Sequence, residues 1–177
     1  MKYLGTAFEQ LQFAIKLMTA AELGHLKVEE IDTPNVIQDG RSVLVLPDRV
    51  LNSQDDLILA CQNNVTINFG AAAITLNRCR EEAGLQLPDP IVSEDDQWIA
   101  LVYQIRNAFA HDIAEPRWNI TRERYSRGFT VGSVTADLTG LDGLPFDHGQ
   151  IGGPEALFLL KDYGLTKLLP ALPDKTP

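Results

Sequence analysis

Apolar residues recur at the spacing of an α-helix through most of the first 116 residues of this chain. The first such series alternates steps of four and three, which places its members on one face of a helix. These positions are Leu4, Phe8, Leu11, Ile15 and Met18. A helix with such a stripe must bury it against another element. The spacing therefore predicts a mainly α protein whose first helix ends near Gly24.

A second long helix is predicted from its start and stop signals. Ser53 precedes Asp55 and Asp56, and a hydroxyl followed by acids suits the positive end of the helix dipole. We expect this helix to run to about Ala83, with Gly84 directly after it.

A third helix is predicted to begin at Ser93, with Asp96 in place of the usual glutamate of a capping box. Its apolar face consists of Trp98, Leu101, Val102, Ile105 and Phe109. The helix cannot pass Pro116, because the residue before a proline is biased away from helix. We therefore expect residues 106–111 to lie on its last turns.

The composition changes in the C-terminal third. Residues 118–121 and 129–138 are rich in β-branched and aromatic residues, which predicts two strands of a small antiparallel sheet. Pro154 suits the first position of a final helix that ends near Gly164. Between the first and second predicted helices, residues 27–52 look irregular apart from one short strand at 43–46.

These elements predict a bundle of about four helices with a small antiparallel β-appendage in the C-terminal third. Residues 1–116 form the bundle, and residues 117–177 form a hairpin appendage with a C-terminal helix packed on the bundle. A length of 177 residues and an apolar fraction of 45% are ordinary for one such domain.

The composition also limits the partners. A net charge of -9 argues against broad nucleic-acid binding, which needs many neutralised phosphates, although one small positive cleft remains compatible with it. Cys61 and Cys79 lie among apolar neighbours in predicted helices, which favours two buried free thiols. Without an apolar run of signal-peptide or membrane-span length, we expect a cytoplasmic protein with no membrane partner.

Arg106, Asn107 and His111 bring three kinds of chemistry within six residues. A guanidinium can hold a phosphate through two parallel hydrogen bonds, and an imidazole can transfer a proton near neutral pH. On a helix, Asn107 and His111 share a face, and the long Arg106 side chain can reach the same surface. This combination suits RNA cleavage without a metal, so we expect no cofactor and no metal site.

A purely structural role for the same residues stays open. Arg106 can pair with Asp95, Asp96 or Glu115, and His111 can cap the C-terminal end of the helix, where a positive charge is favoured.

The sequence Arg-Asn-x-x-x-His at the end of a helix, within a helical bundle, resembles the HEPN domain family. Arg106, Asn107 and His111 match the motif of that family, and the resemblance covers about residues 1–116. It implies a bundle that forms a homodimer through the motif helix, with two copies of Arg106 and His111 lining one cleft. Many members are metal-independent endoribonucleases, and several are toxins with a cognate antitoxin.

The resemblance also implies roles for the motif residues. His111 would act as general base or acid, Arg106 would hold the scissile phosphate, and Asn107 would orient one of them. Single-stranded RNA would then be cut to 2′,3′-cyclic phosphate ends, within a toxin–antitoxin or defence system. The alternative is a non-catalytic HEPN-like module that binds RNA, a nucleotide or a protein partner such as an antitoxin.

Four further arginines follow the motif and are candidate RNA-binding residues: Arg117, Arg122, Arg124 and Arg127. Trp118 and Tyr125 lie among them, and arginines interleaved with aromatic rings can hold phosphates while bases stack. The other interpretation is a solvated strand and turn, balanced by Glu115 and Glu123. His148, with Asp142 nearby, lacks convergent metal ligands, and we expect an ordinary loop histidine.

Overall fold

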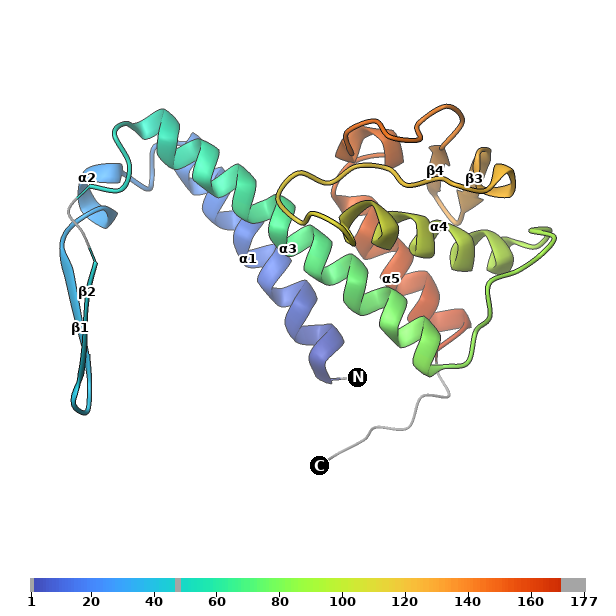
Figure 1. Ribbon diagram of the computed structural model, residues 1–177, viewed down its shortest axis with the longest axis horizontal. Helices are drawn as coiled ribbons and strands as arrows, with labels where there is room; N and C mark the ends of the chain where they lie inside the picture. Colours follow the sequence, from blue (N-terminus) through green and yellow to red (C-terminus); the bar gives the residue numbers. More distant parts are fainter. Residues whose placement is uncertain (1, 47–48, 170–177) are drawn as a thin grey trace. The chain divides into compact units, whose positions relative to one another are not determined.

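The computed structural model describes residues 2–46 and 49–169, and its fold is mainly α, as expected (Figure 1). The helices are α1 (Lys2–Glu22), the one-turn α2 (Val28–Ile31), α3 (Gln54–Glu82), α4 (Glu94–Phe109) and α5 (Glu155–Lys167). The strands form two antiparallel hairpins, β1 (Asn35–Asp39) with β2 (Ser42–Leu46) and β3 (Gly128–Val131) with β4 (Val134–Asp137). Two 3-10 turns complete the fold, η1 (Glu123–Tyr125) and η2 (His148–Ile151).

The chain divides into two compact units. The first comprises residues 1–11 and 66–177, and the second comprises residues 12–65. Both α1 and α3 contribute residues to each unit. The boundary expected near residue 116 falls inside the first unit.

Helix α4 lies at the centre of the first unit, where it packs against α5 and β3. Trp98 is fully buried, and its indole N–H donates to the carbonyl oxygen of Leu160 at 2.7 Å. Gly164 lies against the same ring, since a Cβ at this position would overlap its carbons. Helix α5 continues past Gly164 to Lys167, so the end expected near Gly164 falls three residues early. The glycine serves as a contact surface inside the helix.

The C-terminal sheet lies within residues 128–137. Phe129 pairs with Ala136 across the two strands, and both side chains are buried. The strand expected at 118–121 was wrong, because the backbone N–H groups of this segment donate to a loop and a side chain instead of to a neighbouring strand. The Trp118 N–H donates to the carbonyl of Leu144, and the Ile120 N–H donates to the Asp142 carboxylate. The segment thus runs beside the loop that precedes η2.

The second unit has a small core of its own. Ala21, Val28, Leu57 and Cys61 are buried together, and neighbouring apolar side chains pack against them. The Gln54 side chain connects the start of α3 to residues 21–28. Its amide donates to the carbonyls of Ala21 and Leu26, and its oxygen accepts the Val28 N–H.

The strand expected at 43–46 is confirmed as most of β2, but the irregular structure expected around it was wrong. β1 pairs along the whole of β2, with Val36 opposite Val45 and Ile37 opposite Leu44. Gly40, at a φ of 56°, closes the turn between the two strands. Figure 1 shows the strands side by side up to this turn.

Candidate functional site

Helix α4 carries the first two motif residues, Arg106 and Asn107, on its last turn. The helix begins as predicted, with the Ser93 hydroxyl accepting the Asp96 N–H and the Asp96 carboxylate accepting the Ser93 N–H. The Ser93 N–H, the Ser93 hydroxyl and the Val92 N–H lower the pKa of Asp96. The helix ends at Phe109, so Arg106 and Asn107 are helical and His111 is not. The expected sharing of a helix face by Asn107 and His111 was therefore wrong.

Arg106 is half-buried and has one side-chain partner, its neighbour Asn107. The guanidinium donates to the Asn107 carboxamide oxygen at 3.1 Å. Within residues 2–46 and 49–169, Arg106 forms no ion pair, so the pairing with Asp95, Asp96 or Glu115 is not seen there. Most of the five N–H donors of this guanidinium are left for another acceptor.

His111 is exposed two residues beyond the end of α4. Its Nε2 lies 3.4 Å from the amide nitrogen of Asn119, which donates when Nε2 is unprotonated. The chain then turns at Asp112, whose carboxylate accepts the N–H groups of Ala114 and Glu115. These two donors lower the pKa of Asp112. His111 is therefore followed by a defined turn, and no local pattern in the sequence predicts its contact with Asn119.

A cavity of about 320 Å³ lies beside the residues that follow His111. Its lining comes from three segments: Thr66; Ala114, Glu115, Pro116 and Arg117; and Pro145, Phe146, Asp147 and His148. Neither Arg106 nor His111 lines it. The segment that directly follows the motif, residues 114–117, therefore forms part of the cavity wall, while the motif residues do not.

His148 differs from the loop histidine that we expected. Its ring packs edge-on against Phe69, with 4.6 Å between the ring centroids, and also against Phe146. Nε2 is buried and, within the described residues, has no hydrogen-bond partner. Burial lowers the pKa of this imidazole, and the charge of Asp147 opposes that effect only in part.

The four candidate RNA-binding arginines have different surroundings. Arg117 is exposed at the cavity and donates to the Gly143 carbonyl at 3.3 Å. Arg122 is exposed, and within the described residues its side chain has no hydrogen bond or ion pair. Arg127 is exposed and donates to the carbonyls of Ile91 and Gly128.

Arg124, the remaining candidate, is held inside the first unit. It forms an ion pair with Asp89 at 2.5 Å, donates to the Tyr125 hydroxyl at 2.9 Å and lies over the Tyr125 ring. Trp118 and Tyr125 are buried, at 1% and 2% exposure, so neither ring is available for a base to stack on. Arg117 and Arg122 are therefore the arginines best placed to meet a phosphate.

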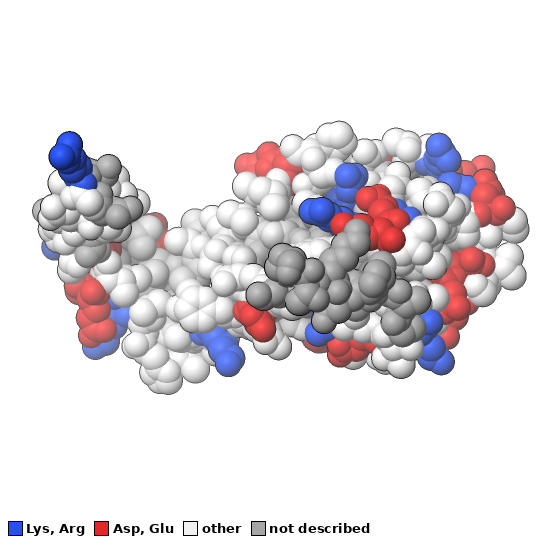
Figure 2. Space-filling model, turned by 90° about the horizontal axis from the view of Figure 1, so that it is seen from below, with Lys and Arg blue, Asp and Glu red and all other residues white. Residues whose placement is uncertain are grey.

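Figure 2 shows acidic and basic side chains interspersed on one face of the described molecule, with no broad basic area there. This distribution agrees with the net charge of -9 and favours a local site for any anion. No group of three or more His, Cys, Asp or Glu residues suited to a metal occurs among the described residues. Cys61 and Cys79 are both free and buried, as expected.

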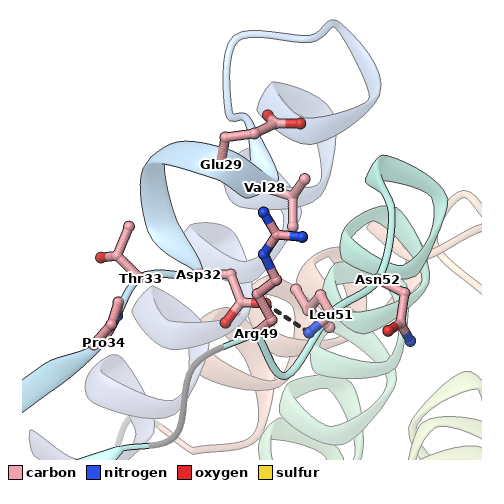
Figure 3. Close-up of a pocket in the computed structure, with 8 residues that line it drawn as sticks. All are labelled: Val28, Glu29, Asp32, Thr33, Pro34, Arg49, Leu51 and Asn52. Atoms are coloured by element: carbon pink, nitrogen blue, oxygen red, sulfur yellow. Dashed lines mark hydrogen bonds between the residues drawn. The ribbon is translucent and has the colours of Figure 1, made fainter.

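A second cavity, of about 270 Å³, lies in the second unit (Figure 3). The Arg49 guanidinium points toward Val28 and Glu29, and its backbone has a positive φ of 49°. Asp32 lines the same cavity, and its carboxylate accepts the N–H groups of Val50 and Leu51. No local pattern in the sequence predicts this cavity, whose lining includes one cation, Arg49, and two acids, Glu29 and Asp32.

One helix among the described residues, Gln54–Glu82, is long and apolar enough to cross a membrane by length and composition alone. Comparisons with family models, with curated proteins and with solved structures find no match to this chain.

Proposed function

We propose that this protein is a HEPN-like, metal-independent endoribonuclease that cuts single-stranded RNA and leaves 2′,3′-cyclic phosphate ends. The observation that carries the proposal is the availability of the two motif side chains. Arg106 has no acidic partner among the described residues, and His111 is exposed with only a 3.4 Å contact to Asn119. A guanidinium and an imidazole with free donors can together bind a phosphodiester.

In this mechanism His111 takes the proton from the ribose 2′-hydroxyl, and the resulting oxygen attacks the adjacent phosphorus. Arg106 donates to the non-bridging phosphate oxygens, whose charge grows in the transition state. Asn107 keeps the guanidinium oriented through the hydrogen bond at 3.1 Å. The 5′-oxygen of the next nucleotide then leaves with a proton from a general acid, which His111 of a second copy would supply.

The proposed active form is a homodimer in the cytoplasm whose motif helices lie side by side. Two copies would bring two Arg106 and two His111 side chains to one cleft, and Arg117 and Arg122 would hold phosphates farther along the strand. Within the toxin–antitoxin or defence setting that we propose, a partner protein of the antitoxin type would cover this cleft.

Cleavage of a labelled single-stranded RNA in the presence of EDTA tests the proposal. His111→Ala should lower the rate by about 10²- to 10⁴-fold, the usual contribution of a general acid or base. His25→Ala removes another exposed histidine, from the second unit, and should leave the rate unchanged. Both variants should unfold at the wild-type urea concentration. Cleavage that persists in His111→Ala, or that EDTA abolishes, would contradict the proposal.

The second candidate function is a non-catalytic module that binds RNA, a nucleotide or a protein partner. One observation favours it, because Arg106 and His111 share neither a hydrogen bond nor a cavity within the described chain. In this case Arg106→Ala weakens RNA binding, and no cyclic phosphate forms with the wild-type protein.

A further inference from the structure

The β1–β2 hairpin exposes apolar side chains on both of its faces. Val36, Val43 and Val45 lie on one face and are 60–67% exposed. Ile37, Leu44 and Leu46 lie on the other face and are 39–55% exposed. In the described part of the chain, these strands pair only with each other. A two-stranded hairpin is marginally stable in water, and a third strand or a covering helix is normally required.

The free edge of β2 lacks the features that usually protect an exposed strand. Charged side chains, prolines and bulges keep most free edges from pairing with another chain. Residues 42–46 contain no charge and no proline, and their pairing with β1 is continuous. β1 contains one charged residue, Asp39, whereas the charge and the proline nearest to β2, Arg41 and Pro47, lie outside that strand. Of the two outer edges, that of β2 is therefore the one without a charged residue.

We propose that β2 is a self-association edge, through which two copies of this chain pair their hairpins into one four-stranded antiparallel sheet. A second copy suits the edge because the strand carries no charge, so identical strands meet without repulsion. When a twofold axis passes between Leu44 and its copy, the cross-strand row becomes Ile37, Leu44, Leu44 of the partner and Ile37 of the partner. Every neighbour in this row is aliphatic.

This contact differs from the motif-helix contact of the proposed nuclease and does not rest on that function. Light scattering after size-exclusion chromatography tests it on the full chain. Val43→Lys with Val45→Lys should halve the mass of the wild-type assembly. Val92→Lys is the matched control, because Val92 is 75% exposed and lies outside the hairpin. This control should keep the wild-type mass.

A cysteine experiment locates the contact. Cys61 and Cys79 are buried, so Leu44→Cys adds an exposed thiol at the proposed axis. Directly opposed residues in antiparallel strands are close enough for a disulfide. Mild oxidation should therefore link Leu44→Cys chains in pairs, while Val92→Cys chains stay single on a non-reducing gel.

Three results would overturn the proposal. They are a single-chain mass for the wild type at all concentrations, a mass that the double lysine substitution leaves unchanged, and equal linking of the two cysteine variants. Co-sedimentation of a single-chain wild type with phosphatidylcholine vesicles would assign the apolar hairpin to a lipid surface instead.

Discussion

Trp98 and Gly164 lie in direct contact across α4 and α5, and the ring fills the space that a side chain at Gly164 would need. Trp98 is fully buried and held by its hydrogen bond to Leu160, so it cannot move aside. Gly164→Ala should therefore lower the free energy of unfolding by about 1–3 kcal/mol through overpacking. Urea denaturation followed by tryptophan fluorescence measures the change.

Gly5→Ala is the matched control for this effect. Gly5 is exposed within α1, and a Cβ there meets nothing within 4 Å. Because alanine is the better helix former, the same substitution should raise the free energy of unfolding by about 0.5–1 kcal/mol. Equal effects of both substitutions would show that the Trp98 contact does not limit the size of residue 164.

His148 should make the stability of the first unit depend on pH. Burial lowers its pKa in the folded state, so the unfolded chain binds more protons just below the ordinary value of about 6.5. The contribution of His148 to the free energy of unfolding should hence be complete above that pH and should be lost as the pH drops below it. Urea titrations at a series of pH values between 7.5 and 5 follow this loss.

His148→Gln should reduce this pH dependence, because it removes the titrating group from the contact with Phe69 and Phe146. His25→Gln, which changes an exposed histidine, should leave it as in the wild type. An unchanged slope in His148→Gln would assign the pH dependence to another group.

Substitution of Arg124 should affect mainly stability, whereas substitution of Arg122 should affect mainly RNA binding. Arg124→Ala removes the ion pair with Asp89 and the hydrogen bond to Tyr125, and should cost about 1–3 kcal/mol of stability. Arg122→Ala should change stability by less than about 0.5 kcal/mol, since this side chain is exposed. RNA affinity, measured by fluorescence anisotropy, should fall in Arg122→Ala. A stable Arg124→Ala protein would contradict the structural assignment.

The capping box should be measurable as a contribution to stability. Ser93→Ala removes the hydroxyl that accepts the Asp96 N–H, and should lower the free energy of unfolding by about 1 kcal/mol. Ser133→Ala, at an exposed turn between β3 and β4, should have little effect. Thermal unfolding followed by circular dichroism compares the two variants. Equal midpoints would mean that another group caps α4.

Local signals sufficed to predict the long helices. The apolar stripe of α1, the acids after Ser53 and the Ser93–Asp96 pair depend on neighbours within a few residues, and each element was found close to its observed bounds. Gly164 was misleading because its role depends on Trp98, which is 66 positions away in the chain, and no local pattern reports such a contact.

The candidate site was harder to predict for the same reason. The motif spacing identifies Arg106, Asn107 and His111 and predicts a helical His111, but the helix ends at Phe109. Arg122 and Arg124 look equivalent in the sequence, although Arg124 forms an ion pair with Asp89, 35 positions away in the chain. Chemical type can be read from single residues, whereas availability depends on partners that only the folded chain brings together.

The anchors at the base of the β1–β2 hairpin make this segment exchangeable. The Asp32 carboxylate holds the backbone of Val50 and Leu51, and Gln54 ties the start of α3 to Ala21 and Leu26. Both anchors lie outside the strands, so the chain between them can be lengthened, shortened or replaced while its ends stay fixed. Descendants of such a chain can acquire new binding partners at this position without rebuilding the helices that carry it.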